Sequence, residues 1–369
     1  MTNKKLFNRI VVVSGNLYRR KYDEPSSSGS DISLEANIDS LLPYSEAIDV
    51  ISLSKKDLPS KEILRNGVTV YRVTEDEVPR EIALLNRSFG PYDFLLTQLL
   101  LSDIAINEAN KLGIKVVYFF RSLGVTLDFR IGGKHKIDVL VANSKYVAKK
   151  ISDQYSRKVE IINFCLGDIN KIKGKSIDNP HFDITMFNPT ENKGGEIFFK
   201  LAKEFPNLRF RAILGWMDLK TPDGKSYDPK LMRLMALAHS GQDKNIYIPT
   251  DLPIPKLPNL TISLPQSNVG KIYQNTRLII VPSQWEEAFA RVIVEAAINN
   301  KHVLVSRVAG TPEAFKIAGL SETLMINNYQ SVTAWKNKLS WYFENSQKIA
   351  HPRPKLPRPN LHKILVKYI

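Results

Sequence analysis

The chain has 369 residues, 43% hydrophobic and 24% charged, which is the composition of a soluble globular protein with enough material for two α/β domains. Its net charge of +15 suits nucleic acid, anionic lipid or acidic small molecules, but no zinc-finger or recognition-helix pattern favours nucleic acid. A single cysteine, Cys165, excludes an internal disulfide, and the absence of a His/Cys cluster, of a leader pattern and of any apolar run near the roughly 20 residues that span a bilayer predicts a cytoplasmic protein without a structural metal.

The first half of the chain alternates buried-strand patterns with helical patterns. Strands are expected at 10–14, 50–53, 68–73, 94–96, 116–120 and 139–142, and helices at 34–42, 104–112 and 145–152. Such alternation predicts a parallel sheet covered on both faces. Gly15 follows the first strand directly, which predicts a tight turn at the carboxyl end of that strand.

The same pattern restarts after a polar stretch that has no clear periodicity. Strands are expected at 184–187, 209–214, 278–281 and 303–306, with helices at 196–204, 291–299 and 331–343. We therefore expect an α/β protein with two Rossmann-like, doubly wound domains, 1–167 and 181–345, joined by a linker at 168–180. Ligands would bind in a cleft between the carboxyl ends of the two sets of strands. The helix at 331–343 is expected to cross back to the first domain.

Two segments depart from this pattern. Residues 217–260, rich in Asp, Pro and Lys, predict an insertion around one helix at 229–238. The basic tail, 346–369, contains no acidic residue from Lys348 onward. We expect it either to be solvated and poorly ordered, to hold an anionic surface such as a membrane, or to pack back on the first domain.

The segment 281–297 carries the most chemical information. A buried strand ends at Val281, a helix is expected to begin near Ala288, and Glu295 lies among apolar residues of that helix. A buried carboxylate needs a partner, which could be the two hydroxyls of a ribose or an internal Arg or Lys. Glu287 precedes the helix, where it could meet the hydroxyls of a sugar or simply cap the positive helix start.

Backbone groups at two helix starts suggest anion binding. The amides of Phe289, Ala290 and Arg291 are expected to lack intrahelical acceptors and to be available to an anion or a sugar oxygen. The Arg291 side chain could either bind a ligand or brace a carboxylate. At another helix start, Lys193 is followed by Gly194 and Gly195, a pattern that predicts a phosphate cradle, the alternative being a solvated lysine.

These segments together resemble a known family. The run Pro282-Ser-Gln-Trp-Glu-Glu-Ala-Phe-Ala-Arg-Val-Ile-Val-Glu-Ala296 resembles the E-x7-E motif of the large retaining family of GT-B-fold glycosyltransferases, the family 4-like "glycosyl transferases group 1". Ala309-Gly-Thr-Pro-Glu313 resembles the turn after that family's next strand, and Asn192-Lys-Gly-Gly195 resembles its Lys-Gly motif. With similar pieces at 66–73 and 141–148, the likeness covers roughly residues 8–345, and its context makes the weak E-x7-E pattern specific.

The resemblance implies transfer of a sugar, with retention, from a nucleotide-diphosphate sugar to a hydroxyl of a glycan, glycolipid or small glycoside, without a metal or another cofactor. It implies catalytic roles for Glu287 and Lys193, with Arg121 at a third catalytic position. The donor would be bound by Glu295, Gly15, Gly194, Gly195, Phe289, Ala290, Arg291, Gly310 and Thr311. The acceptor would bind to first-domain loops such as 19–32, and the base to loops such as 264–268.

Two departures from the family pattern keep other functions open. Residues 186–192, before Lys193, contain no arginine to act as a second diphosphate ligand. Arg121-Ser122 stands where many relatives have a histidine, and an arginine cannot shuttle a proton, although it can stabilise charge on a phosphate or an anionic acceptor. The alternatives are a catalytically altered subunit that binds nucleotide sugar or glycan, and a nucleotide-sugar 2-epimerase. An epimerase would need first-domain carboxylates; Asp93, Asp103 and Glu108 are present.

Overall fold

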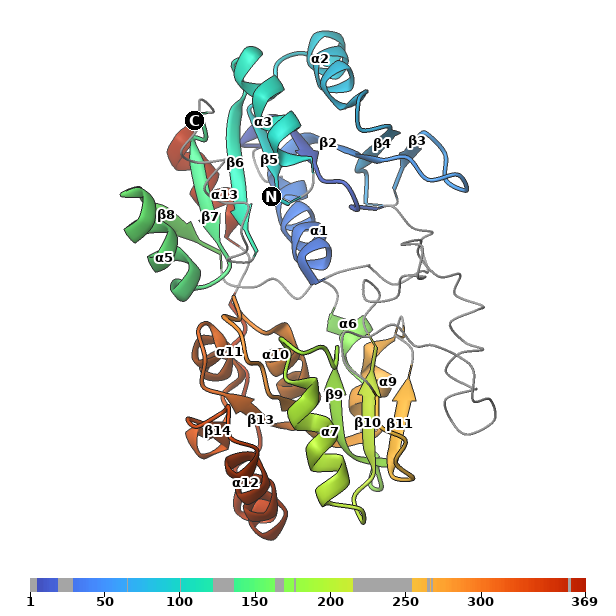
Figure 1. The fold of residues 1–369 in the computed structure, drawn as a ribbon. Coiled ribbons are helices and arrows are strands. Elements are labelled where there is room, and N and C mark those ends of the chain that lie inside the picture. Colours follow the sequence, from blue (N-terminus) through green and yellow to red (C-terminus); the bar gives the residue numbers. More distant parts are fainter. Residues whose placement is uncertain are drawn as a thin grey trace. The chain divides into compact units, whose positions relative to one another are not determined.

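The computed structural model forms two compact units (Figure 1). It describes residues 5–18, 29–64, 66–99, 101–121, 136–162, 169–175, 177–214, 254–263, 266, 268–357 and 360–369. Unit 1 comprises Met1–Gly167 and Pro357–Ile369, and unit 2 comprises Asp168–Leu356. The helix expected at 229–238, most of the loop 19–32, most of the base loop 264–268, Cys165 and Ser122 lie outside the described residues.

Unit 1 is built on an eight-stranded sheet with the strand order β3-β4-β2-β1-β5-β6-β7-β8. All neighbouring strands pair in parallel except β3 and β4, which are antiparallel. The strands are β1 (Phe7–Val13), β2 (Ser45–Leu53), β3 (Lys61–Ile63), β4 (Thr69–Val73), β5 (Phe94–Thr97), β6 (Lys115–Phe120), β7 (Val139–Ala142) and β8 (Val159–Ile161). Each strand expected in this half is present, and the three-residue edge strands β3 and β8 were not expected.

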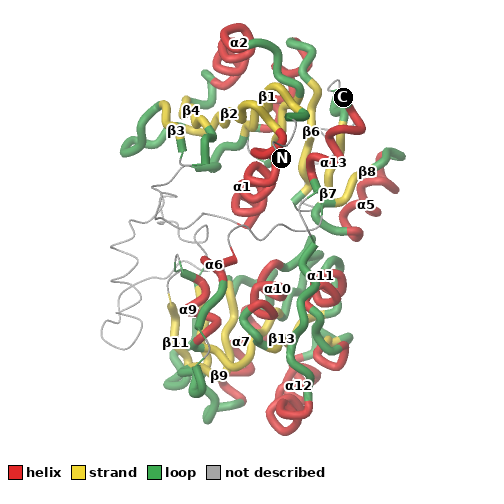
Figure 2. The backbone as a smooth tube through the Cα atoms, turned by 180° about the vertical axis from the view of Figure 1, so that it is seen from behind, coloured by secondary structure: helices red, strands yellow, loops and turns green. Residues whose placement is uncertain are grey.

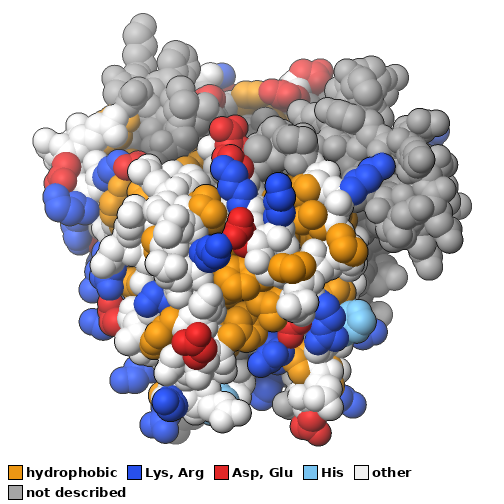
Figure 3. All heavy atoms as spheres, turned by 60° about the horizontal axis from the view of Figure 1, so that its bottom comes forward, with side chains coloured by type: hydrophobic (Ala, Val, Ile, Leu, Met, Phe, Trp, Pro, Cys, Tyr) orange, Lys and Arg blue, Asp and Glu red, His pale blue; other side chains and the backbone are white. Residues whose placement is uncertain are grey.

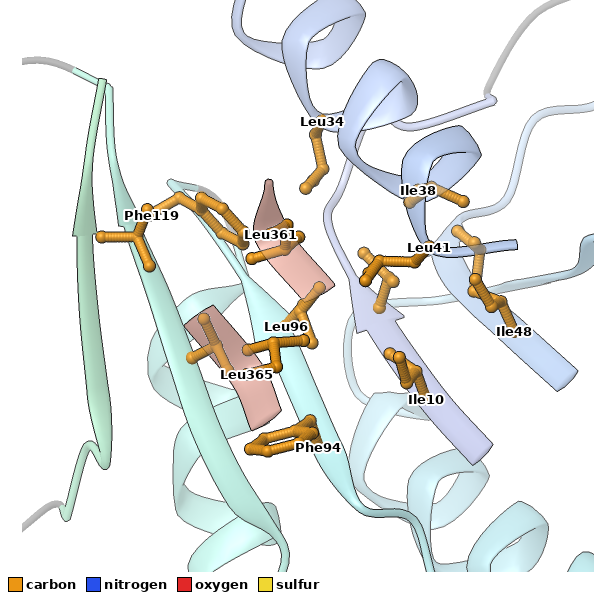
Figure 4. Close-up of a cluster of buried hydrophobic side chains, with 14 of the residues drawn as sticks. Ile10, Leu34, Ile38, Leu41, Ile48, Phe94, Leu96, Phe119, Leu361 and Leu365 are labelled. Atoms are coloured by element: carbon orange, nitrogen blue, oxygen red, sulfur yellow. The ribbon is translucent and has the colours of Figure 1, made fainter. Parts of the chain in front are cut away.

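Helices cover both faces of the unit 1 sheet, which explains why its central strands are buried at almost every position. The helices are α1 (Gly29–Leu41), α2 (Val78–Phe89), α3 (Ser102–Lys111), α5 (Lys145–Tyr155) and α13 (Leu361–Leu365), with short 3-10 turns η1 (Leu42–Tyr44) and η5 (Val366–Tyr368). The helices α1 and α13 lie side by side, as do α2 and α3 (Figure 2). Under α1 and α13 lies the main core, where Leu34, Ile38, Leu361 and Leu365 meet strand residues such as Leu96 (Figure 4).

The basic tail is folded over its described residues, so the expectation of a poorly ordered tail is wrong for that part of the chain. The Lys355 amide donates to the carbonyl of Ile317 at 2.8 Å in unit 2. Beyond it, Leu361 and Leu365 are fully buried in the core of unit 1, and Lys367 pairs with Glu160 at 3.3 Å. That the remaining cations contact an anionic membrane surface stays a prediction.

Unit 2 contains a six-stranded, all-parallel sheet with the order β11-β10-β9-β12-β13-β14. The strands are β9 (Phe182–Phe187), β10 (Phe210–Ile213), β11 (Leu260–Ser263), β12 (Thr276–Val281), β13 (His302–Ser306) and β14 (Met325–Ile326). The helices are α6 (Ile169–Ile172), α7 (Gly195–Glu204), α9 (Val269–Gln274), α10 (Arg291–Ile298), α11 (Thr311–Ala318) and α12 (Val332–Asn345), with η3 (Glu322–Leu324) and η4 (Ser346–Lys348).

Two connections differ from expectation. The helix α12 packs against α7 inside unit 2, so the expectation that this segment crosses back to the first domain is wrong; the chain returns at Pro357. Part of the expected linker is folded into unit 2, because the Gly174 amide donates to Asn299 Oδ1 at 2.7 Å and Asn299 Nδ2 donates to the carbonyl of Ile172 at 3.0 Å.

The surface charge is dispersed rather than gathered. Figure 3 shows Lys and Arg side chains spread over one face, with Asp and Glu side chains among them. Among the described helices, none combines the length and apolarity that a bilayer crossing requires. In both sheets the strand order reverses at one place, between β1 and β5 in unit 1 and between β9 and β12 in unit 2. Open α/β sheets bind ligands at such points, outside the carboxyl ends of the strands.

Candidate active site

The reversal point of the unit 2 sheet brings Lys193 and Glu287 together. Lys193 follows β9 and Glu287 follows β12, and the Lys193 ammonium forms an ion pair with Glu287 Oε1. The same carboxylate oxygen accepts a hydrogen bond from Ser283 Oγ at 2.9 Å. The Lys193 ammonium also lies over the Trp285 ring, 4.9 Å from its centre. Glu287 is 6% exposed, so its charge is held by partners within the chain.

Two glycines allow the loop 282–290, which carries Glu287, to be held between two helix starts. A Cβ on Gly194, at the start of α7, would lie 1.9 Å from the Pro282 carbonyl oxygen. A Cβ on Gly310, at the start of α11, would lie 2.1 Å from the Ala288 carbonyl oxygen. The Gly310 amide donates to the carbonyl of Glu287 at 2.8 Å. The backbone approach at both points therefore fixes where the Glu287 side chain begins.

The predicted phosphate cradle at Gly194 and Gly195 is wrong in this structure. Their amides donate to the carbonyls of Glu191 and Thr190, at 2.8 Å each. Gly194 has φ +82°, so the chain makes a tight left-handed turn before α7, and closing that turn uses both N–H groups. Of this motif, the Lys193 side chain remains as the group that can meet a phosphate.

Glu295 receives its partners from within the chain, as the internal-arginine alternative predicts. Its Oε1 is bound by Arg291 through Nη2 at 3.0 Å and Nε at 3.1 Å, and its Oε2 accepts from the Tyr273 hydroxyl at 2.9 Å. Burial, together with the adjacent carboxylate, raises the pKa of Tyr273 well above its usual value and keeps the hydroxyl a donor. Arg291 thus braces a carboxylate, and the inference that burial alone demands a ribose is not needed.

The predicted ligand groups at the next two helix starts have structural roles. The helix α10 begins at Arg291, later than expected, because Ala290 adopts a left-handed φ of +54°. Phe289 is 3% exposed and belongs to the core. The Thr311 amide and hydroxyl both donate to the carbonyl of Val308, at 3.0 and 2.8 Å, and the hydroxyl also lies 2.6 Å from the carbonyl of Ser306. Thr311 therefore closes the start of α11, and the prediction that it binds the donor is wrong.

The remaining predicted residues, Gly15 and Arg121, lie in unit 1. Gly15 is buried in the turn after β1, and its carbonyl accepts from the Leu53 amide at 3.1 Å. Arg121 directly follows β6; its Nε donates to Gln98 Oε1 at 2.8 Å, and its guanidinium lies 4.9 Å from the centre of the Phe119 ring. Gln98 directly follows β5 and is fully buried.

Four residues of these groups were missed by the sequence reasoning. Ser283 and Trp285 lie inside the motif that contains Glu287, but nothing in their spacing indicates contact with Glu287 or Lys193. Tyr273 is on α9, far from Glu295 in sequence, and carries no local signal. Gln98 could have been found, because a polar residue directly after a buried strand lies at the carboxyl edge of a parallel sheet. The described residues contain no group of three or more His, Cys, Asp or Glu placed to hold a metal ion.

The comparison with protein families concerns unit 2. Residues 256–355 match the family described as Glycosyl transferases group 1. This range includes Glu287, Arg291 and Glu295, and it ends before the chain returns to unit 1. Among curated proteins, none matches the chain.

Solved structures match almost the whole chain. Sucrose-phosphate synthase from Thermosynechococcus elongatus superposes with a TM-score of 0.68 at 13% identity, covering 92% of this chain and 90% of that one. HepE from Anabaena, solved with UDP and glucose, gives 0.64 at 14% identity, covering 93% and 91%. The catalytic domain of starch synthase IV from Arabidopsis thaliana, bound to ADP and acarbose, gives 0.57 at 9% identity, covering 98% and 99%.

The chain has a GT-B fold. At these identities the likeness is one of fold, and it extends over both units of this GT-B chain. Function therefore depends on the site, which in unit 2 is the pair of groups formed by Lys193 with Glu287 and by Arg291 with Glu295.

Proposed function

We propose that this chain is a retaining glycosyltransferase that moves a sugar from a nucleotide-diphosphate sugar to a hydroxyl of a glycan, a lipid-linked saccharide or a small glycoside. The observation that carries the proposal is the Lys193–Glu287 pair at the reversal point of unit 2, next to the segment that matches Glycosyl transferases group 1. The relatives of similar fold that were solved with UDP, with UDP-glucose or with ADP support a nucleotide sugar as donor.

Lys193 would exchange partners when the donor binds. In the unliganded chain its ammonium is paired with Glu287 and lies over Trp285. A donor diphosphate offers more negative charge than one carboxylate and would draw the ammonium away. Glu287, still held by Ser283 at 2.9 Å, would then accept hydroxyls of the sugar. Hydrogen bonds to charged groups contribute about 1.5–3 kcal/mol, so neither exchange is costly.

Glu295 would bind the ribose of the donor. A carboxylate has about four acceptor positions, and Arg291 and Tyr273 fill three. Their contacts come from α10 and α9, so the carboxylate is fixed before the ribose arrives. Preorganisation of this kind reduces the entropy cost of binding.

For the chemical step, the acceptor hydroxyl would attack the face from which the diphosphate leaves, through an oxocarbenium-like transition state. Negative charge builds on the leaving phosphate, and Lys193 would stabilise that charge. The leaving diphosphate would take the proton of the acceptor hydroxyl, so no side chain need act as a base. The positive charge of Lys193 performs the part that a metal ion would otherwise play, and we propose metal-independent transfer.

One observation favours a second candidate, a catalytically altered subunit that binds nucleotide sugar without turning it over. The charge of Lys193 is neutralised by Glu287, and residues 186–192 supply no arginine to assist it. If the donor diphosphate cannot displace Glu287, the chain would bind donors weakly and transfer no sugar.

A panel of radiolabelled UDP-, ADP- and GDP-sugars, with and without sugar acceptors and with EDTA, separates these functions. A glycosyltransferase gives transfer, or slow hydrolysis when no acceptor is present, and it does so in EDTA. An altered subunit gives binding without turnover, and an epimerase gives a new nucleotide sugar. Either of the last two results would overturn the proposal.

Three variants locate the donor site. Lys193→Ala should weaken nucleoside diphosphate binding about tenfold, because a charge-assisted contact is lost. Glu287→Ala should abolish transfer and change nucleotide affinity by less than about threefold. Lys200→Ala is the control, because Lys200 is an exposed α7 lysine in an ion pair with Glu196. Equal losses in the Lys193 and Lys200 variants would contradict the role of Lys193.

A further inference from the structure

The core face of the unit 1 sheet ends in a row of polar residues at its carboxyl edge. On this face, the last core residues of five strands are Val50, Val12, Leu96, Phe119 and Val141. Two positions beyond them along the same strands lie Ser52, Ser14, Gln98, Arg121 and Asn143. Side chains alternate between the faces of a strand, so these polar residues continue the face that α1 and α13 cover (Figure 4).

Several buried polar atoms of this row lack a partner within the described structure. They are Ser52 Oγ, Gln98 Nε2 and Asn143 Oδ1, together with both amide atoms of Asn37 on α1. Gln98 and Ser52 are 0% exposed, and Asn37 is 1% exposed. Asn37 stands beside Ile38, which packs on this same face. A buried polar atom without a hydrogen bond costs about 1–3 kcal/mol, so several gathered at one edge indicate a site that a ligand or water completes.

The position of the row agrees with ligand binding. Ser14 and Gln98 directly follow β1 and β5, the neighbouring strands between which the order of the sheet reverses. This is where open α/β sheets bind ligands. The unsatisfied atoms and the topology are independent observations, and they point to the same edge.

The chemistry of the row fits an alcohol-rich molecule. The atoms without partners include donors, such as Gln98 Nε2, acceptors, such as Asn143 Oδ1, and a hydroxyl that can be either. A sugar offers hydroxyls that donate and accept in the same way. Arg121 adds a permanent positive charge, held in place by the 2.8 Å contact between its Nε and Gln98 Oε1.

We propose that this edge, formed by Asn37, Ser52, Gln98, Arg121 and Asn143, is the acceptor site, and that the acceptor is a sugar carrying a phosphate or a carboxylate. Gln98 has two parts in it: its oxygen positions Arg121, and its Nε2 binds a sugar hydroxyl. The guanidinium binds the anionic group, which phosphate and carboxylate both present in a geometry that suits arginine. This inference rests on the proposed glycosyl transfer.

Equilibrium binding by calorimetry tests the inference on the full chain, with glucose, glucose 6-phosphate and glucuronate as probes, each with and without UDP. The wild-type chain should bind at least one anionic probe about tenfold more tightly than glucose. The two anionic probes separate phosphate from carboxylate. Arg121→Gln should remove this preference, and Arg121→Lys should keep most of it. Arg80→Gln, the same change at an exposed position of unit 1, should leave it unaltered.

Gln98→Leu should weaken binding of all three probes about threefold to tenfold, because one hydrogen bond to the sugar is lost. The inference is wrong if glucose binds as tightly as its anionic forms, if none of the probes binds at millimolar concentration, or if only ordered water occupies this edge in crystals soaked with glucose 6-phosphate. Transfer to neutral acceptors alone would refute this inference and leave the proposed function intact. Binding of an anionic sugar without any use of nucleotide sugars would refute the proposed function instead.

Discussion

Tyr273 decides how the Glu295 carboxylate is oriented. Arg291 lies one turn before Glu295 on the same helix, so that contact alone would let the carboxylate turn with the helix surface. The Tyr273 hydroxyl comes from α9 and binds the other oxygen at 2.9 Å. Since Tyr273 is 0% exposed, its ring is fixed by packing, and the carboxylate is held from two directions.

Replacing Tyr273 by phenylalanine should therefore affect donor binding more than chemistry. The expected change is a rise of about threefold to tenfold in the KM for the nucleotide sugar, with kcat changed less, because Arg291 still pairs with Glu295. Steady-state kinetics with the active donor measures both. Tyr342→Phe is the matched control, since this buried tyrosine contacts His302 in the same unit. Equal changes in KM for the two variants would show that Tyr273 has only a structural role.

At the residue scale, the sequence predicts which charged residues gather at the donor site, but not how they pair. Lys193 and Glu287 are both predicted from motifs, and the structure joins them in an ion pair. The predicted amide donors of Gly194 and Gly195 fail because backbone hydrogen bonding depends on the turn, which a motif does not specify. Tyr273 escapes prediction because its contact with Glu295 depends on the packing of α9 against its neighbours.

At the scale of elements, the loop 282–290 depends on two helix starts that touch it. The Gly310 amide binds the Glu287 carbonyl, and there is no room for a side chain between Gly310 and Ala288. The start of α11 therefore acts as a stop for the loop that presents Glu287.

Gly310→Ala should displace this loop. A Cβ would lie 2.1 Å from the Ala288 carbonyl oxygen, so backbone must shift. We expect a loss of about 1–3 kcal/mol in the stability of unit 2, and a fall of about tenfold in turnover. Gly319→Ala is a matched control at the other end of α11, where a Cβ would lie 2.2 Å from the carbonyl of Arg353. It should lower stability and leave turnover of the folded fraction unchanged; equal turnover losses would refute the role of Gly310.

His302, the first residue of β13, should make the stability of unit 2 dependent on pH. Its ring nitrogens lie 3.2 Å from the Tyr342 hydroxyl and 3.2 Å from the carbonyl of Ala350, and burial lowers its pKa below 6.5. The unfolded chain therefore binds a proton more readily than the folded chain. The stabilising contribution is complete above pH 6.5 and is lost as the pH falls through the folded pKa.

Urea unfolding at pH 7.5 and at pH 5 measures this effect. The wild-type chain should be less stable at the lower pH, and His302→Gln should reduce that difference. His181→Gln is the control, because His181 is exposed in the same unit. A pH dependence that persists fully in the His302 variant would contradict the assignment.

Prediction succeeds for elements with a long enough pattern. The long buried strands and the amphipathic helices of both units were expected near their observed positions. The strands β3, β8, β11 and β14 have two to four residues each, which is too short for a period to appear. The helix α13 is equally short, and it forms because its apolar residues find a place beside α1, which no local pattern reveals.

At the scale of the whole molecule, the alternation of strands and helices was sufficient to predict the GT-B fold. It was not sufficient to predict how the chain closes, because the return to unit 1 depends on a few apolar residues after Pro357. Leu361, Ile364 and Leu365 complete a core whose other members come from the first half of the chain.

Leu365→Ala should destabilise unit 1 by about 2–5 kcal/mol, because Leu365 is 0% exposed and its loss leaves a cavity. The affinity of unit 2 for nucleoside diphosphate should be unchanged while the chain remains folded. Thermal unfolding and nucleotide titration measure the two effects. Val366→Ala is the control, since Val366 is 45% exposed. If the two variants unfold at the same temperature, α13 does not support the core.

The return of the chain to unit 1 also sets the order in which the two halves can mature during synthesis. Domains usually fold as they leave the ribosome, the amino-terminal one first. Here the half that is translated first lacks three of its buried leucine and isoleucine side chains until residues 361–365 have been made, whereas the half translated second has all its parts earlier. We expect nascent chains that stop before residue 357 to contain a finished nucleotide half attached to an incomplete partner, which makes the final helix the step that commits the molecule to its native state.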